Sequence, residues 1–156
     1  MPTQAHLYSK ETTMNMALFG ATGRLGSQVL QQALEYGYTV NALVRDPAKL
    51  TLQHPNLSVH LGNAFNLQDV LAVVQGQKVV VSTLGGGIQP ETLQVLSQGL
   101  SNISSAMHTS GIRRIVAIGS AGILQYDADT LRRDQPSYPA MFKTVSQAHL
   151  EAYKIL

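Results

Sequence analysis

The feature that most constrains the fold of this chain is a glycine turn between an apolar run and a stretch with helical periodicity. The apolar run covers residues 14–19 and leads directly into Gly20-Ala-Thr-Gly-Arg-Leu-Gly26, whose glycines are spaced three residues apart. Aliphatic residues then recur at helical spacing up to residue 34. Gly37 follows at a position where a helix C-terminus favours a residue with positive φ. The pattern predicts a strand, a tight turn and a helix.

The remainder of the chain repeats this alternation. Asn66 is expected to cap a helix that reaches Val74, and Pro90 suits the first turn of a helix that carries one apolar stripe down to Met107. Short apolar runs alternating with helices are typical of a parallel sheet that is covered on both faces. Further strands are predicted at 38–44, 57–61, 78–83 and 115–118, a short helix at 48–52, and a last helix from 141 to 156.

The predicted fold class is α/β, a three-layer, Rossmann-like, doubly wound parallel sheet. Five strands are expected to be present, and one or more C-terminal strands are expected to be missing from the sheet. The fifth strand would then form an edge with free backbone groups, so pairing into a homo-oligomer through this edge is expected.

Length and composition agree with a single domain. The chain has 156 residues, of which 44% are hydrophobic and 13% charged, so it can bury a core and is not disordered as a whole. The segment 1–13 is mixed and polar, and we expect it to be a disordered leader to a nucleotide-binding domain at 14–156. Because there is no apolar stretch of about 18 residues, a cytoplasmic location is expected.

Several kinds of site are excluded or disfavoured. The chain has no cysteine, so it has neither disulfides nor thiolate ligands, and its five histidines show no metal-ligand spacing. The formal net charge is +2, and the longest basic runs are the pairs Arg113-Arg114 and Arg132-Arg133. A nucleic-acid interface needs a denser basic stripe, so nucleic acid is not expected as a partner. A membrane is not expected either, because the chain has no long apolar stretch.

The glycine turn suits a dinucleotide pyrophosphate. Phosphates need a close approach of the backbone and free amide donors at a helix N-terminus, which residues 23–26 can present. The strand that follows ends in Val44-Arg45, without the acidic residue that usually holds the ribose hydroxyls of NAD. Arg45 and Arg24 could instead clamp a 2′-phosphate, which predicts NADP(H). The alternatives are a purely structural turn and two solvated arginines, and Asp46 lies directly beside Arg45.

Five segments together resemble the NmrA-like, atypical short-chain dehydrogenase/reductase families. Within these families, the sequence is most similar to the biliverdin IXβ reductase/flavin reductase group, whose cofactor is NADPH. The resemblance extends over residues 14–156. It is carried by Gly20-Ala-Thr-Gly-Arg-Leu-Gly26, Leu43-Val-Arg-Asp-Pro47, Gly62-Asn63, Val81-Ser-Thr-Leu-Gly85 and Gly119-Ser-Ala121.

The resemblance implies a set of cofactor-binding residues. Thr22 and Arg24 would contact phosphates and Arg45 the 2′-phosphate. Asn63 would lie by the adenine, at a position where relatives usually carry aspartate, and its amide could still accept a bond from the adenine amino group. The full set is Gly20, Thr22, Gly23, Arg24, Leu25, Gly26, Arg45, Asn63, Leu84 and Gly85.

The resemblance also implies a substrate site at Ser120 and His149. Ser120 follows the fifth predicted strand, where open α/β sheets place their sites. A neutral histidine could position a substrate or relay a proton, although a lone histidine on an amphipathic helix is often structural. The Tyr-x-x-x-Lys pair of classical family members is missing, because Tyr138 and Lys143 are one residue too far apart.

The resulting functional prediction is an NADPH-dependent reductase that transfers hydride to a small planar acceptor of flavin, quinone or tetrapyrrole type. One alternative is a non-catalytic, NmrA-like NADP-binding redox sensor. A second is a protein related to nucleotide-sugar epimerases and dehydratases, which the missing Tyr-x-x-x-Lys pair disfavours. The sequence does not identify the acceptor.

Overall fold

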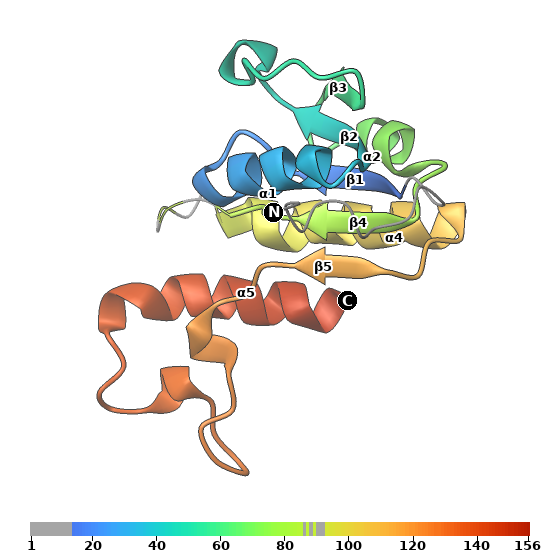
Figure 1. Ribbon diagram of the computed structural model, residues 1–156. Helices are drawn as coiled ribbons and strands as arrows, with labels where there is room; N and C mark the ends of the chain where they lie inside the picture. The colour runs from blue at the N-terminus through green and yellow to red at the C-terminus, as the bar shows by residue number, and fades with distance from the viewer. Residues whose placement is uncertain (1–13, 86, 88, 90–92) are drawn as a thin grey trace, which may run out of the picture.

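The computed structural model describes residues 14–85, 87, 89 and 93–156. The expectations of a disordered leader at 1–13 and of a first helical turn at Pro90 lie outside these described residues. Within them, five strands form one sheet in the order β3-β2-β1-β4-β5, and every neighbouring pair is parallel (Figure 1). The predicted doubly wound α/β fold is therefore confirmed.

The strands and main helices lie close to their predicted positions. The strands are β1 (Asn15–Phe19), β2 (Thr39–Val44), β3 (Leu57–Leu61), β4 (Val79–Ser82) and β5 (Ile115–Ala117). The main helices are α1 (Arg24–Glu35), α2 (Leu67–Val74), α4 (Leu100–Ser110) and α5 (Lys143–Ile155). Local chemistry sets these ends: the Asn66 side chain accepts a hydrogen bond from the Gln68 amide at 2.9 Å, and Gly37 has a φ of 80° just after α1.

Shorter helical turns connect these elements. A π-helical turn, η3 (Val95–Gly99), leads into α4, and three 3₁₀ turns, η4 (Ala121–Ile123), η5 (Arg132–Asp134) and η6 (Ala140–Phe142), precede α5. The helix expected at 48–52 is instead a single 3₁₀ turn, η2 (Pro47–Lys49). It begins earlier than expected because the Asp46 carboxylate accepts from the Ala48 amide at 3.1 Å and Pro47 fixes the first φ angle.

The sheet separates two apolar cores. Ala17, Phe19 and Val80 face α2, α4 and α5, whereas the alternating neighbours on the same strands face α1. The stripe predicted on the fourth helical segment is buried in the first core, which confirms that amphipathic pattern; its members are Leu93, Leu96, Leu100, Ile103 and Met107.

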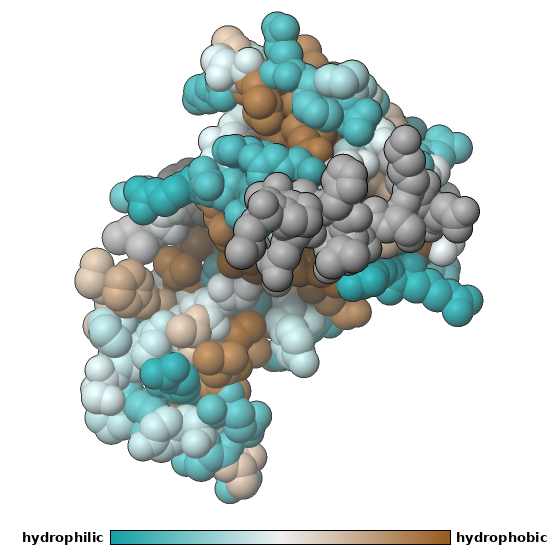
Figure 2. All heavy atoms as spheres, viewed as in Figure 1, coloured by the Kyte–Doolittle hydropathy of each residue, from teal (hydrophilic) through white to brown (hydrophobic). Residues whose placement is uncertain are grey.

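The two edges of the sheet retain exposed aliphatic side chains. On β5, Val116 is 49% exposed, and Ile118, just beyond it, is 43% exposed. On β3, Val59 and Leu61 are also exposed, and Figure 2 shows an apolar area near the top of the view, where β3 lies in Figure 1. The segment between β5 and α5 projects away from the sheet (Figure 1). Among the described residues, no helix is long and apolar enough to cross a membrane.

Candidate functional site

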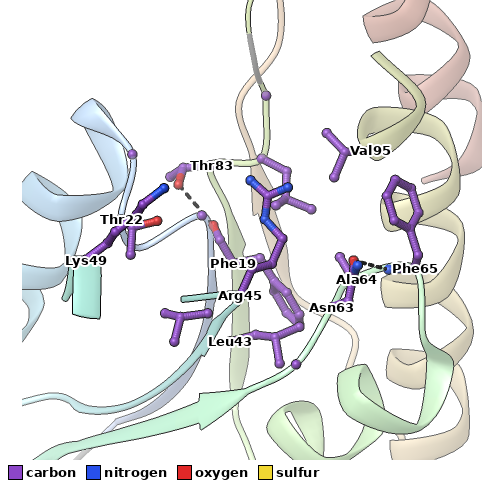
Figure 3. A pocket seen from close by; sticks show the side chains of 16 residues that line it. Phe19, Thr22, Leu43, Arg45, Lys49, Asn63, Ala64, Phe65, Thr83 and Val95 are labelled. Carbon is purple, nitrogen blue, oxygen red and sulfur yellow. Dashed lines mark hydrogen bonds between the residues drawn. The ribbon is translucent and has the colours of Figure 1, made fainter. Parts of the chain in front are cut away.

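A cavity of about 500 Å³ lies where the carboxyl ends of β1 to β4 meet (Figure 3). This is the position at which open parallel sheets bind ligands, and the volume is in the range of small-molecule sites. Its wall combines the glycine turn after β1, the end of β2, the loop after β3 and the end of β4. It is lined by Phe19, Gly20, Thr22, Gly23, Leu43, Val44, Arg45, Lys49, Gly62, Asn63, Ala64, Phe65, Thr83, Leu84, Gly85 and Val95.

The glycine turn brings the N-terminus of α1 to this cavity. Gly20 has a φ of 86°, and its carbonyl accepts a hydrogen bond from the Gly23 amide at 2.9 Å. Helix α1 begins at Arg24 with no side-chain cap and no acidic residue in its first turn. The first amides of a helix have no acceptor within the helix, so this end of α1 can donate hydrogen bonds to an anion.

The residue after β4 is hydrogen-bonded to the last residue of β1, beside the glycine turn. Both the amide and the hydroxyl of Thr83 donate to the Phe19 carbonyl, at 2.9 and 3.0 Å. A Cβ atom on Gly20 would lie 2.6 Å from the Thr83 hydroxyl oxygen, so this packing requires glycine there. Thr83 was not among the predicted site residues. The signal that could have found it was its place directly after the buried strand β4, Val79–Ser82.

Two cations line the cavity after β2. Arg45 and Lys49 are both exposed, and the single ion pair between described residues joins Arg133 and Asp134 instead. Asp46, which the sequence places beside Arg45, caps η2 with its carboxylate. Lys49 was not predicted as a site residue. The short turn η2 carries it back to the cavity, where it lies beside Thr22 (Figure 3), with which it also lines a smaller adjoining cavity.

The loop after β3 is held by side-chain bonds. The Asn63 amide donates to Asp69 Oδ2 at 2.9 Å, and the Asn63 side-chain oxygen accepts from the Phe65 amide at 3.0 Å. A Cβ on Gly62 would lie 2.8 Å from the Asp69 Cβ. The loop therefore has little freedom to move relative to α2, and it keeps Asn63 and Phe65 on the cavity wall.

The predicted substrate residues lie outside this cavity. The Ser120 hydroxyl caps η4, where it accepts from the Gly122 amide at 3.2 Å, and it lies 3.2 Å from the Ser146 hydroxyl. The Tyr138 hydroxyl lies 2.7 Å from that of the fully buried Ser146. A continuous chain of three hydroxyls therefore connects the end of β5 to α5. Tyr138 was considered from sequence only as half of a pair with Lys143.

His149 is half-buried on α5. Burial lowers the pKa of its imidazole below the ordinary value of 6.5, and a hydrogen bond to the backbone of Ile118 partly opposes that shift. The ring is therefore uncharged at neutral pH. No group of three residues able to hold a metal ion occurs in the described parts of the chain.

The cavity brings together seven of the ten residues predicted to bind the cofactor: Gly20, Thr22, Gly23, Arg45, Asn63, Leu84 and Gly85. Arg24, Leu25 and Gly26 form the first turn of α1 and do not line it. Arg24 is exposed, whereas Gly26 is buried against the carbonyl of Gly20 and the Thr83 hydroxyl. The glycine at 26 thus serves the close packing of the helix on the strands.

Comparisons with known proteins agree with this geometry. A protein family described as NAD(P)H-binding matches residues 20–156. The uncharacterised protein YwnB of Bacillus subtilis is 29% identical over 130 residues, which cover 81% of this chain and 57% of YwnB.

Two solved structures show the same fold. A Bacteroides thetaiotaomicron protein, provisionally named an epimerase, superposes with a TM-score of 0.77 at 27% identity, over 92% of this chain and 64% of that one. A Streptococcus pneumoniae protein, provisionally named an NADH-flavin reductase, superposes with a TM-score of 0.73 at 24% identity, over 91% of this chain and 65% of that one. The chain thus spans less than two thirds of the length of these relatives.

Proposed function

The chain belongs to the NAD(P)H-binding family, and from that premise we propose that it binds NADPH and transfers hydride from it to a small planar acceptor of flavin, quinone or tetrapyrrole type. The observation that carries the proposal is one cavity that is lined by two cations without ion-pair partners among the described residues and by a glycine turn that leads directly into the uncapped N-terminus of α1. These groups complement a pyrophosphate and a second, separate phosphate.

Different residues of the cavity bind different parts of the cofactor. The glycine turn, of which Gly20, Thr22 and Gly23 line the cavity, holds the pyrophosphate with its amides and the Thr22 hydroxyl. The adjoining first turn of α1 (Arg24, Leu25 and Gly26) adds its free amides and the Arg24 guanidinium. Arg45 and Lys49 hold the 2′-phosphate at the end of β2, where the Asp46 carboxylate accepts from the Ala48 amide and no described acidic residue lines the cavity. Two cations favour a phosphate dianion over a ribose hydroxyl, so NADPH is preferred to NADH.

The remaining predicted residues bind the base and the part of the cofactor that follows the pyrophosphate. Asn63, Leu84 and Gly85 all line the cavity, and in this proposal Asn63 contacts the base while Leu84 and Gly85 contact the cofactor after β4. A Cβ atom added to Gly85 would meet no atom within 4 Å, so this stretch leaves open space for a ligand. When bound, the cofactor supplies the hydride; the protein supplies orientation and excludes water.

Ser120 and His149 act on the acceptor. Ser120 follows β5, the strand next to β4, so it lies at the carboxyl ends of the strands, as the cavity does. The neutral imidazole of His149 can donate or accept a hydrogen bond at neutral pH, which suits positioning of an uncharged acceptor. No residue has to act as a strong acid, because a reduced flavin-like acceptor can take its proton from water.

Turnover provides the test. The purified chain is mixed with NADPH and a flavin or a quinone, and the absorbance of reduced nicotinamide is followed against a protein-free control and against the Arg45→Ala variant. We expect oxidation above the protein-free rate, and a lower rate for the variant at limiting NADPH. Tight NADPH binding without oxidation of any acceptor would instead favour a non-catalytic redox sensor.

A further inference from the structure

The loop after β3 presents a hydrogen-bond donor to the cavity. A backbone amide can only donate, so the atom of Asn63 that faces the Phe65 amide at 3.0 Å must be the side-chain oxygen. This fixes the orientation of the side-chain amide and turns Nδ2 to the other side. Nδ2 has no partner in the described parts of the chain, and it is not buried.

The order of the sheet assigns Asn63 to the base of the dinucleotide. With the pyrophosphate at the N-terminus of α1 and the ribose at the end of β2, the base extends away from β1. The next strand in that direction is β3, and the loop that follows it contains Asn63. This assignment rests on the proposed function.

The same end of the cavity has apolar walls. Ala64, Phe65 and Val95 line it together with Asn63, and Figure 3 shows the Phe65 ring on the side of Val95. Aromatic and aliphatic faces bind any purine by stacking and van der Waals contact, because every base has a flat apolar face. Discrimination between purines must therefore come from a polar group at the edge of the base.

We propose that Asn63 recognises the purine by donating an Nδ2 hydrogen, so that the site accepts a 6-oxo purine dinucleotide at least as readily as the 6-amino purine of NADPH. A donor matches the ring nitrogen N7, which both purines carry, and the oxygen at C6 of hypoxanthine. It does not match the amino group at C6 of adenine, which is itself a donor. An aspartate that faces C6 would reverse the preference, because a carboxylate accepts from the amino group of adenine and repels the oxygen of hypoxanthine.

Calorimetric titration of the whole chain with NADPH and with its reduced hypoxanthine analogue tests this. For the unchanged protein, the dissociation constant of the analogue should be equal to or lower than that of NADPH. For Asn63→Asp, which can still accept from the Phe65 amide, we expect NADPH to bind about tenfold more tightly than the analogue. Asn66→Asp is the matched control, since it changes the same functional group, keeps an N-cap on α2 and lies outside the cavity lining.

The outcomes separate this inference from the proposed function. If the unchanged protein binds NADPH more than about threefold more tightly than the analogue, or if Asn63→Asp leaves the ratio unchanged, the role of Asn63 is refuted while NADPH binding stands. If neither dinucleotide binds to the unchanged protein or to Asn66→Asp, the proposed cofactor itself is wrong, and the inference falls with it.

Discussion

Arg45 and Lys49 place two positive charges beside one cavity. The nearest acidic residue in the sequence is Asp46, whose carboxylate caps η2 by accepting from the Ala48 amide. A phosphate dianion gains two charge-assisted bonds at such a site, whereas a ribose hydroxyl gains far less. We expect Arg45→Ala to weaken NADPH binding by ~1 to 3 kcal/mol and to leave NADH binding nearly unchanged, as measured by calorimetric titration with both cofactors. Lys49→Ala should act in the same direction.

Arg113→Ala is the control for these two variants. Arg113 is also an exposed arginine, but it precedes β5 at the opposite end of the sheet. Its loss should change neither dissociation constant. An equal loss of NADPH and NADH affinity in Arg45→Ala would contradict the assignment of Arg45 to the 2′-phosphate.

His149 links burial to a dependence of stability on pH. Because burial lowers its pKa in the folded state below the ordinary value of 6.5, the unfolded chain binds a proton at a higher pH than the folded chain does. The contribution of the neutral imidazole to stability is therefore complete above 6.5 and is lost as the pH falls from 6.5 through the folded-state pKa.

We expect the free energy of unfolding in urea to decrease between about pH 8 and about pH 5.5, and His149→Gln to show a smaller decrease over that interval. His108→Gln removes an exposed imidazole from the end of α4 and should keep the slope of the unchanged protein. A slope that is identical in His149→Gln and in the unchanged protein would show that another group titrates.

At the scale of elements, the turn after β1 depends on glycine for packing. A Cβ atom on Gly26 would collide with the carbonyl of Gly20 and lie 2.6 Å from the Thr83 hydroxyl oxygen, so α1 would have to move away from β1 and β4. We expect Gly26→Ala to destabilise the fold by ~1 to 3 kcal/mol, measured by thermal or urea unfolding. Such a shift would also displace the N-terminus of α1 and weaken NADPH binding.

Gly85→Ala provides the contrast. A methyl group at this position meets no atom within 4 Å, so the variant should unfold at the same temperature as the unchanged protein. If the cofactor lies along Gly85, the added methyl group should nevertheless weaken NADPH binding. A large loss of stability in Gly85→Ala, or none in Gly26→Ala, would contradict this packing of α1 against β1 and β4.

The elements were predictable from sequence because their signals are local. Periodicity, the Asn66 cap and glycines after helices depend on residues within a few positions of one another, and the strands and main helices lie close to the predicted ranges. The start of η2 was missed because the Asp46 cap competes with helical periodicity. Lys49 was missed as a site residue because only the folded chain brings it to the glycine turn. Thr83 was missed because its partner, the Phe19 carbonyl, is 64 residues away, although its place after a buried strand was a usable signal.

The chain of three hydroxyls was also not predictable from local sequence signals. Ser120 is 26 residues and Tyr138 is eight residues from Ser146, and the irregular segment 121–142 determines how the three meet. Helical spacing tests only whether Tyr138 could pair with Lys143. It says nothing about a contact between the Tyr138 hydroxyl and a serine further along α5.

At the scale of the molecule, the sheet formed by the described residues has two edge strands, β3 and β5. The three-residue strand β5 pairs with β4, and within the described part of the chain it has no neighbour on its other side. Val116 lies in register with Val81, and its side chain is half exposed, as is that of Ile118. Ile115 and Ala117, on the other face, pack against the core that α4 and α5 cover. An aliphatic face next to unpaired backbone groups is the kind of edge that pairs with a second chain.

We therefore expect the chain to self-associate through β5, with a mass by light scattering that rises with protein concentration. Val116→Lys should return it to a monomer, because a charge on an edge strand opposes pairing. Val59→Lys is the matched variant on the β3 edge, where Ser58 and His60 interrupt the aliphatic residues, and it should leave the association unchanged. A monodisperse monomer of the unchanged protein at all concentrations would refute pairing. Dissociation only in Val59→Lys would assign the contact to β3.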